Sequence, residues 1–388
     1  MIQGWHTYLL SELLTIKNGK DHKALAEGKY PVIGSGGIMR YVDSFLYNKP
    51  SILLPRKGTL DNIQFCDTPF WTVDTLYYTE VKDSLTHPYY LYWYLRMLDL
   101  SKLDSGTGVP SMTFESYYNI KVNLPPLSVQ RKIGKLLSDI DRKIALNRRM
   151  NATLEAMARQ LYDYWFLQFD FPDAHGKPYK SSGGKMTWNN KLKREIPEGW
   201  SVIPLHDGAE VQYGFPFSTE LFVESEAGYP VVRIRDILDG TTSAFTTEVP
   251  DVKYQILKGD VIVGMDGNFH MNFWHVDTTF LNQRCVRLRA KNNSAISAMQ
   301  IYFDINPYIK AKELNAKGST VAHLSDKDIK CLYLIKPSDS QTFNPRPTFD
   351  AILSKMVSCR VQISTLTRLR TTLLPLLMNA QVEVTKAL

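Results

Sequence analysis

Polar and apolar residues between positions 133 and 165 alternate with the spacing of an amphipathic helix. Apolar residues recur in alternating steps of four and three, and two amides share their face: Ile133, Leu137, Ile140, Ile144, Asn147, Asn151, Leu154, Ala158, Leu161 and Trp165. Such steps place the residues along one side of a helix, as in a coiled coil. The pattern predicts a long helix in the middle of the chain that pairs with another helix.

A second helix of this kind is predicted near the end of the chain. Its series repeats the same steps: Ile352, Met356, Cys359, Ile363, Leu366, Arg370, Leu373 and Leu377. Ser128 and Thr348 follow prolines and can cap the two helices, and Pro375 should end or kink the second one. About forty residues at 1.5 Å per residue would make a rod of ~60 Å.

The two helices are expected to pair antiparallel. Their register would be set by Ile140, Ile144, Asn147, Asn151, Ile363 and Leu366. Amides on a paired face lower stability but fix register and orientation. The alternative, that Asn147 and Asn151 face solvent or another subunit, stays open.

The segments before the two helices also occur twice. "GW" recurs at 4–5 and 199–200, and Ile16 and Gly19 match Val211 and Gly214. Further matches follow in the same order: "GKYPVIGS" with "GYPVVRIR", "SILLPRKG" with "DVIVGMDG", and "SGTGVPSMT" with "KGSTVAHLS". In each copy, short β-rich runs separated by turn residues alternate with helical pieces. A tandem duplication of a mixed α/β domain is therefore predicted.

The predicted fold class is α/β (α+β): a duplicated mixed α/β domain with a long helix after each copy, the helices forming an antiparallel coiled coil with pseudo-two-fold symmetry. The expected divisions are domain 1 at 1–125, a first long helix at 126–168, a connector at 169–196, domain 2 at 197–344, and a second helix with the tail at 345–388. The connector could be a flexible linker, but its aromatic residues favour packing.

Composition narrows the class of protein. The 388 residues are 44% hydrophobic and 22% charged, which suits an ordinary globular chain with two cores. A net charge of +7 makes nucleic acid a plausible partner, although a basic surface can also serve solubility alone. The four cysteines are far apart, and the N-terminus lacks the features of a signal peptide. A cytoplasmic protein is expected.

Motifs for catalysis are missing from the sequence. "SSGGKM" does not complete a phosphate-binding loop, and no GxSxG element occurs. His270 and His275 lack a third metal ligand, and "PDVK" at 250–253 is better read as a turn than as a nuclease motif. We expect no catalytic residue, no metal site and no cofactor in this chain.

Polar loop residues at matched positions remain as candidate DNA-binding residues. In the first copy they are Lys20, Ser35, Arg40, Arg56, Lys57, Ser105 and Thr107. In the second copy they are Arg233, Arg235, Asp266, Asn268, Gln283, Arg284, Lys317, Ser319, Thr320 and His323. Such side chains read base edges and hold phosphates, although each taken singly also fits an ordinary loop. Because the frameworks repeat and the polar residues differ, the two copies are expected to read different short sequences.

The chain resembles the specificity subunits of type I restriction–modification systems. The resemblance is strongest in "LPPLSVQRKIGKLLSDIDRKIALNRRMNATLEAMARQLYDYWF", and extends to "FDFPDAHGKPYKSSGGKM", "REIPEGW" and "GSTVAHLSDKDIK". It implies two recognition domains that each read one half of an asymmetric, interrupted DNA site, with the helices setting the gap.

The resemblance also implies the partners. Two modification subunits would bind S-adenosylmethionine and methylate adenine at N6, and two restriction subunits would use ATP and Mg²⁺. Two other hypotheses are a paired-helix scaffold or inhibitor of a related defence complex, which makes protein contacts only, and a self-contained nucleic-acid enzyme. The missing motifs argue against the enzyme.

Overall fold

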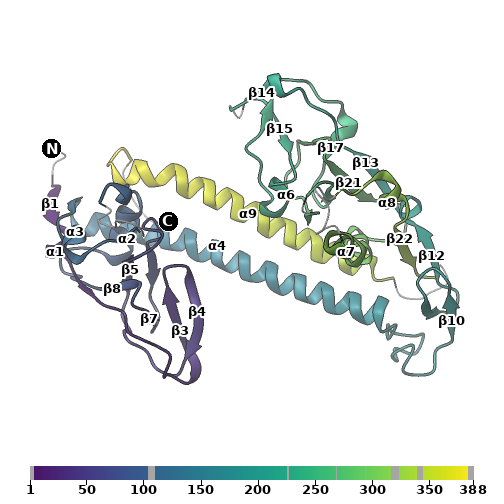
Figure 1. The fold of residues 1–388 in the computed structure, drawn as a ribbon, viewed down its shortest axis with the longest axis horizontal. Coiled ribbons are helices and arrows are strands. Elements are labelled where there is room, and N and C mark those ends of the chain that lie inside the picture. The colour runs from purple at the N-terminus through teal and green to yellow at the C-terminus, as the bar shows by residue number, and fades with distance from the viewer. Residues whose placement is uncertain are drawn as a thin grey trace. The chain divides into compact units, whose positions relative to one another are not determined.

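The computed structural model describes residues 4–103, 110–224, 227–267, 269–292, 294–315, 323–338 and 344–382. The chain divides into two compact units, residues 1–144 with 366–388 and residues 145–365 (Figure 1). Two long helices, α4 (Leu127–Tyr162) and α9 (Arg346–Met378), contribute to both units. Among the described helices, none is long and apolar enough to span a membrane.

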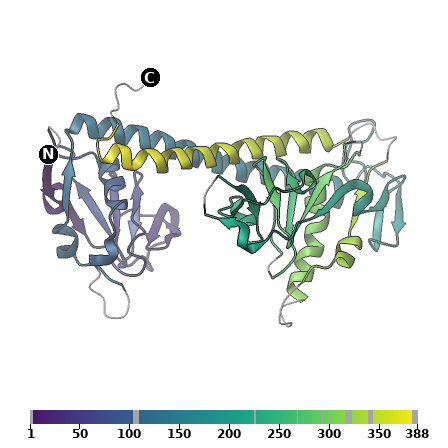
Figure 2. The same ribbon diagram turned by 90° about the horizontal axis from the view of Figure 1, so that it is seen from above.

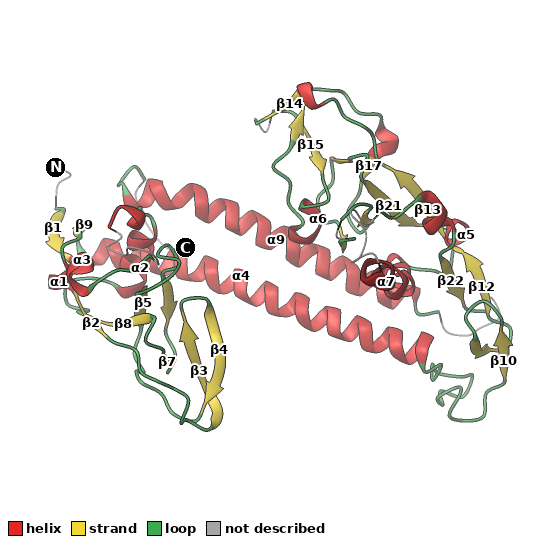
Figure 3. Ribbon diagram, in the orientation of Figure 1, coloured by secondary structure: helices red, strands yellow, loops and turns green. Residues whose placement is uncertain are grey.

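Unit 1 contains an α/β domain in which three sheets meet (Figure 3). Strands β2 (Leu14–Lys17), β8 (Leu76–Val81), β5 (Ser51–Pro55) and β6 (Gln64–Cys66) form an antiparallel sheet in that order. A second sheet has the order β4 (Gly37–Val42), β3 (Glu27–Gly34), β7 (Trp71–Thr72), and β1 (His6–Leu9) pairs with β9 (Lys121–Leu124). The helices are α1 (Leu10–Leu13), α2 (Pro88–Arg96) and α3 (Phe114–Tyr118), with a 3₁₀ turn at Leu100–Leu103.

Unit 2 contains the second α/β domain. Strands β13 (Ala209–Tyr213), β21 (Cys285–Ala290), β18 (Val261–Gly264) and β19 (Met271–Phe273) form one sheet, and β12 (Ser201–Pro204) pairs with β22 (Tyr333–Lys336). Another sheet has the order β14 (Phe222–Val223), β16 (Phe245–Thr246), β15 (Tyr229–Val232), β20 (Thr279–Leu281), β17 (Gln255–Ile256). The helices are α5 (Leu205–Gly208), α6 (Asp236–Asp239), α7 (Ala298–Asn315) and α8 (Asp326–Lys330), with 3₁₀ turns at Thr219–Leu221 and Val252–Tyr254.

The predicted duplication is visible in the strand orders. The sheet β2-β8-β5-β6 of the first domain corresponds to β13-β21-β18-β19 of the second. In each domain one parallel pair stands beside this sheet, β3 with β7 and β15 with β20. Gly19 and Gly214 occupy the same place, because a Cβ atom would lie 2.0 Å from Val73 O in one domain and 1.8 Å from Asn282 O in the other. The match between these two glycines is confirmed.

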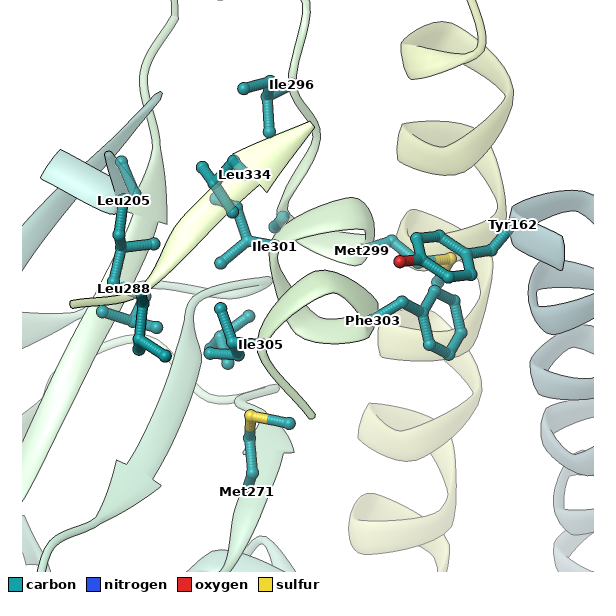
Figure 4. Close-up of a cluster of buried hydrophobic side chains, with 14 of the residues drawn as sticks. Tyr162, Leu205, Met271, Leu288, Ile296, Met299, Ile301, Phe303, Ile305 and Leu334 are labelled. Carbon is teal, nitrogen blue, oxygen red and sulfur yellow. The ribbon is translucent and has the colours of Figure 1, made fainter. Parts of the chain in front are cut away.

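Helix α7 carries apolar residues on two opposite sides because it lies between a sheet and the long helices. Figure 4 shows Ile301 and Ile305 pointing toward Leu288 on the sheet side, whereas Met299 and Phe303 point toward Tyr162 at the end of α4. The hydroxyl of Tyr162 donates a hydrogen bond to Asp304 Oδ1 at 2.7 Å. Burial of both sides fastens the second domain to the long helices of its own unit.

In unit 1, Asp141 of α4 joins three helices. Its Oδ2 accepts hydrogen bonds from Tyr89 Oη at 2.5 Å and from Trp93 Nε1 at 3.2 Å, both on α2, and its Oδ1 pairs with Arg370 of α9. The Arg370 guanidinium also lies 4.8 Å from the Trp93 ring centre. This carboxylate explains why an arginine is present in the otherwise apolar series of the second helix.

The contacts within each unit show that α4 and α9 run in opposite directions (Figures 1 and 2). In unit 1, Ile133 and Leu137 of α4 share a core with Leu377 and Met378 of α9. In unit 2, the core contains Ala158 and Tyr162 of α4 together with residues 349–357 of α9. The beginning of each helix therefore packs near the end of the other, as the apolar steps predicted.

Two predicted helix ends are wrong by a few residues. Ser128 and Thr348 lie inside the first turns, because α4 begins at Leu127 and α9 at Arg346. Asn344 Oδ1 accepts a hydrogen bond from Arg346 N at 2.9 Å, so Asn344 serves the role expected of Thr348. The second helix also continues past Pro375 to Met378. A proline this close to the end of a helix disturbs few backbone hydrogen bonds.

The connector between the long helix and the second domain packs rather than remaining a loose linker. It follows a π-helical turn at Asp163–Leu167, which continues α4, and leads into the hairpin of β10 (Met186–Asn189) and β11 (Arg194–Pro197). Phe169 and Phe171 are buried, and the ring of Phe171 stacks on Trp200 with 4.9 Å between centroids. Trp188 remains exposed.

His275 is a buried structural residue and makes the stability of unit 2 depend on pH. The side chain is 4% exposed, and burial together with Arg360 and Lys258 lowers its pKa from 6.5 to about 4. The folded state therefore binds this proton more weakly than the unfolded state, so stability is lost as the pH falls from 6.5 toward 4. His275 alone contributes a loss of about 3 kcal/mol over this range, whereas Asp304 of the same unit, whose pKa burial raises to about 7, acts in the opposite direction.

The substitution His275→Phe should remove this contribution, because it replaces the titrating ring by an aromatic ring that carries no charge. In denaturant titrations, the difference in unfolding free energy between wild type and variant should change by about 3 kcal/mol between pH 6.5 and pH 4. His175→Gln is the matched control, since His175 is exposed, and it should keep the wild-type slope. An unchanged slope in His275→Phe would show that other groups cause the acid sensitivity.

Candidate nucleic-acid interface

The second domain gathers several candidate residues at the carboxyl ends of two parallel strands. Val232 ends β15 and Leu281 ends β20, and these two residues are paired across the ladder. Arg233 and Arg235 follow the first strand, and Gln283 and Arg284 follow the second. A backbone hydrogen bond from Asn282 N to Val232 O joins these two loops, and one from Gln283 N to Phe215 O ties the second loop to the segment after β13.

Asp236 organises the loop after β15. Its Oδ2 accepts a hydrogen bond from Arg233 N at 2.9 Å and lies 3.3 Å from Arg233 Nε, and it also accepts from Thr242 Oγ1 at 3.3 Å. The Arg235 guanidinium is mostly exposed, with Nε 4.0 Å from Asp236 Oδ1. Arg233 therefore helps to close a turn, whereas Arg235 is available to a ligand.

Asp266, Arg284 and His323 form one cluster in the second domain, although they come from three distant segments. Arg284 Nη1 lies 2.9 Å from Asp266 Oδ2, and His323 Nδ1 lies 2.5 Å from Asp266 Oδ1. The backbone joins the same segments through hydrogen bonds from Met265 N to Arg284 O and from Leu324 N to Met265 O. The sheet framework thus sets the positions of all three side chains.

Among the described residues, Cys285 supplies the only thiol at this edge, and this thiol is unreactive. Burial, with the carboxylates of Asp236 and Asp266 nearby, raises the pKa of the Cys285 thiol to about 12. The thiol is therefore neutral at physiological pH and is a poor nucleophile. Within the described ranges, no group of three or more His, Cys, Asp or Glu side chains could hold a metal ion.

In the first domain the candidate residues surround the loop that follows β7. Lys20 N donates to Thr72 O at 2.8 Å, and Arg56 N donates to Thr75 O at 3.0 Å. Arg56 Nη1 also donates to Asp74 O at 3.3 Å, and Lys57 is exposed beside it. Ser35 lines a hollow of about 810 Å³ together with residues 21–23, 34–39 and 73–75. These four candidates are therefore brought together.

Arg40 is not part of these clusters, and six other candidates cannot be placed. Arg40 lies on β4, and its Nη2 donates to Leu25 O at 2.8 Å, which occupies the guanidinium within the domain. Ser105, Thr107, Asn268, Lys317, Ser319 and Thr320 lie outside the residues that the structure describes.

Several residues of these surfaces were not found from the sequence. Asp236 lies close to both Arg233 and Arg235, and its position directly after "RIR" could have marked it in the sequence as their partner. His22 and Lys23 line the hollow, and Ile38 and Met39 are exposed at its border. No spacing or motif marks these four residues, because the hollow depends on how β3 and β7 pair.

The same backbone junction carries different side chains in the two domains. Pairing along β5 and β8, and along β18 and β21, makes Lys57 equivalent to Asp266 and Thr75 equivalent to Arg284. The bridge between Lys57 and Ser111 corresponds to that between Asp266 and His323. Gly58 and Gly267 follow at equivalent positions, and both have positive φ, +94° and +67°. A shared framework therefore presents two chemically different surfaces.

The amides of the long helix differ from each other in their surroundings. Asn147 is 1% exposed, so the solvent-facing alternative is wrong for this residue, and its Nδ2 donates to Gln362 Oε1 of α9 at 3.0 Å. Asn151 is half-buried, and its Oδ1 has no partner among the described residues. Ile140 and Ile144 are buried, and Ile363 and Leu366 are half-buried.

Comparison with known proteins agrees with this architecture. The family model "Type I restriction modification DNA specificity domain" matches residues 2–156 and again residues 197–342. The chain is 23% identical over 351 residues to the type I restriction enzyme MjaIX specificity subunit of Methanocaldococcus jannaschii, covering 87% of this chain and 79% of that protein. It is 28% identical over 169 residues to the EcoBI specificity subunit of Escherichia coli, covering 43% of this chain and 35% of that protein.

A solved structure has the same fold. The crystal structure of the type I restriction–modification S subunit from M. genitalium superposes with a TM-score of 0.66 at 18% identity, covering 96% of each chain. Two copies of the family model lie in one chain and together match well over half of it. The chain therefore belongs to the specificity subunits of type I restriction–modification systems, the non-catalytic subunits that recognise DNA.

Proposed function

We propose that the two domains each read one half of an asymmetric, interrupted site in double-stranded DNA. Domain 1 would extend over residues 1–125 and domain 2 over residues 197–344. The observation that supports this most directly is the shared junction with different side chains, Lys57, Thr75 and Ser111 in one domain and Asp266, Arg284 and His323 in the other. Two identical domains would recognise the same DNA sequence twice, whereas these two surfaces suit two different half-site sequences.

The candidate residues divide into phosphate contacts and base contacts under this proposal. Exposed lysines and arginines without a close carboxylate, such as Lys20 and Lys57, suit phosphates. Side chains held in place by neighbours suit base edges, because recognition of a base needs a defined donor geometry. The candidates outside the described residues, among them Lys317 and Thr320, stay in the proposal as further DNA contacts.

The long helices would set the distance between the half-sites. Ile140, Ile144, Asn147, Asn151, Ile363 and Leu366 would hold the register of an antiparallel coiled coil with approximate two-fold symmetry. A rod of ~60 Å exceeds one turn of DNA, about 34–36 Å, so half-sites on one face of the duplex are within its span. The hydrogen bond between Asn147 and Gln362 supports this role, since a buried amide that needs its partner on the facing helix opposes sliding.

Chemistry would be carried out by partner subunits in the cytoplasm. Two modification subunits would dock on the helices and domains and methylate adenine at N6 with S-adenosylmethionine. Two restriction subunits would add ATP- and Mg²⁺-dependent translocation and cleavage. In this arrangement the present chain selects the site and the other chains act on it.

Co-expression with the modification subunits tests this function. Mapping of N6-methyladenine across the host genome should show one bipartite, asymmetric sequence with a constant gap. The purified complex should also bind that sequence at least ~10³-fold more tightly than random duplex at physiological salt, with affinity falling steeply as salt increases.

Equal binding of the two duplexes at moderate salt would contradict the proposal. That outcome would favour the alternative of a paired-helix scaffold or inhibitor that makes protein contacts only. Methyl transfer by the isolated chain would instead indicate an enzyme.

A further inference from the structure

We propose that Arg284 of the second domain recognises a guanine and that Asp266 is the residue that positions it. This inference rests on the function proposed above and specifies the base chemistry of one half-site. It is argued from the cluster of Asp266, Arg284 and His323 and from the equivalent place in the first domain.

Exposure distinguishes Arg284, which faces outward, from Asp266, which holds it in place. The Arg284 side chain is 61% exposed, whereas that of Asp266 is 21% exposed. Each oxygen of Asp266 already faces a protein group, Oδ2 at Arg284 Nη1 and Oδ1 at His323 Nδ1. Asp266 is therefore occupied within the domain. Of its two partners, Arg284 is the more exposed, at 61% against 51% for His323, and it keeps a planar set of donors. Nε and Nη2 of Arg284 have no hydrogen-bond partner among the described residues.

An arginine held in this way is suited to a base rather than to a phosphate. The carboxylate about 3 Å away offsets much of the positive charge, which weakens the attraction for a phosphate. The planar donors of the guanidinium remain, and they match the O6 and N7 acceptors of guanine in the major groove. The carboxylate also restricts a long side chain that would otherwise lose ~2 kcal/mol of rotamer entropy on binding.

The first domain shows what this junction looks like without such a pair. The equivalents of Asp266, Arg284 and His323 are Lys57, Thr75 and Ser111, and none of them is acidic. An exposed lysine there suits a phosphate as a point charge. The Asp–Arg pair is thus a feature of the second domain and is not required by the shared fold.

Arg233 is not the better candidate, although it also lies beside a carboxylate. Its Nε, its backbone N and Thr242 Oγ1 all lie within hydrogen-bonding distance of Asp236 Oδ2, and Asp236 is buried. The Arg233 side chain is 27% exposed and closes the turn after β15. Its loss should affect folding more than base selection.

The test compares N6-methyladenine maps of cells that express the modification subunits with wild-type or variant chain. The variants are Arg284→Gln, Asp266→Asn and, as a matched control, Arg235→Gln, an exposed arginine of the same edge. The half-site read by domain 2 is the one that persists when residues 1–125 are exchanged. In the wild type this half should contain a G·C pair.

Arg284→Gln should reduce discrimination at that pair roughly 10-fold or more and favour adenine there, since glutamine donates to and accepts from adenine. Asp266→Asn should relax the same pair to a smaller degree, because the arginine is retained but no longer held. Arg235→Gln should lower methylation at all sites without changing the sequence. A structural role for Asp266 would instead lower methylation evenly and leave the base preference unchanged.

Three results would overturn the inference while leaving the proposed function intact: a second half-site without a G·C pair, an Arg284→Gln map that is weaker but unchanged in sequence, or an Asp266→Asn map with no relaxation at the same pair. A wild-type complex that produces no bipartite methylation would overturn both.

Discussion

Exchanging residues 1–125 for the first domain of another specificity subunit is expected to change one half of the methylated site completely and to leave the other half intact. Each domain has its own core and its own parallel-strand edge, and the residues of each edge come from one unit alone. No side chain of the Asp266 cluster belongs to the first domain. The second half-site should therefore keep its sequence.

The join between the exchanged domain and α4 decides whether the hybrid folds. Asp141 accepts hydrogen bonds from Tyr89 and Trp93 of the domain and also pairs with Arg370 of α9. A donor without these two aromatic residues would leave the carboxylate and the guanidinium with fewer partners, at a loss of about 1–3 kcal/mol. The hybrid should therefore retain Tyr89 and Trp93, and its thermal unfolding should be measured beside its methylation map.

The reciprocal exchange of residues 197–344 is the matched control, and it should change only the other half. A hybrid that changes both halves, or neither, would show that the domains do not read independently. Such a result from a hybrid that unfolds like the wild type would refute modular recognition itself.

The parts of the fold that follow a local period could be predicted from the sequence. The steps of four and three along residues 133–165 depend only on the geometry of a helix, and α4 covers Leu127–Tyr162. The duplication could be predicted because residues such as Gly19 and Gly214 have no room for a side chain and are retained in both copies. The exact helix ends could not, since they depend on single capping hydrogen bonds such as the one that Arg346 N donates to the Asn344 side chain.

The candidate site could be predicted as a set of loops but not as a set of contacts. Asp266, Arg284 and His323 meet because β18 pairs with β21 and because Leu324 N bonds to Met265 O. No local pattern encodes those long-range pairings. The hollow beside Ser35 likewise arises from the pairing of β3 with β7, and its glycines read in the sequence only as a turn. Side chains that act by holding others, such as Asp236, therefore escape a search for binding residues.

Removing one heptad from each long helix is expected to abolish methylation of the original sites and to shift it to sites with a shorter gap. The contacts of Asn147 with Gln362 and of Asp141 with Arg370 define which segments face each other within each unit. Deleting residues 143–149 together with 361–367 removes facing segments and retains Asp141, Arg370 and Arg360. Both helices shorten by about 10.5 Å, which corresponds to ~3 base pairs.

The deletion should also weaken methylation, because the rotation of the helix pair no longer matches the rotation of the DNA between the two half-sites. A heptad turns the contact face by only ~20°, whereas three base pairs turn the second half-site by about 100° around the duplex. Part of that difference must be absorbed by twisting the DNA. Methylation maps measure both the gap and the yield, and Leu146→Ala with Arg148→Ala, at exposed positions of the same heptad, should change neither.

Deleting the heptad from α4 alone tests whether the paired helices set the distance between the half-sites or only join the two domains. With unequal helices, the contact between Asp141 and Arg370 in unit 1 and the packing of Ala158 near Met356 in unit 2 require different registers. One set of contacts must then break, so the single deletion should lose stability and methylation together, whereas the paired deletion should keep its stability and methylate sites with a shorter gap at reduced yield. If both deletions kept the wild-type gap, the distance between half-sites would be set by the partner subunits, and the paired helices would serve only to join the two domains.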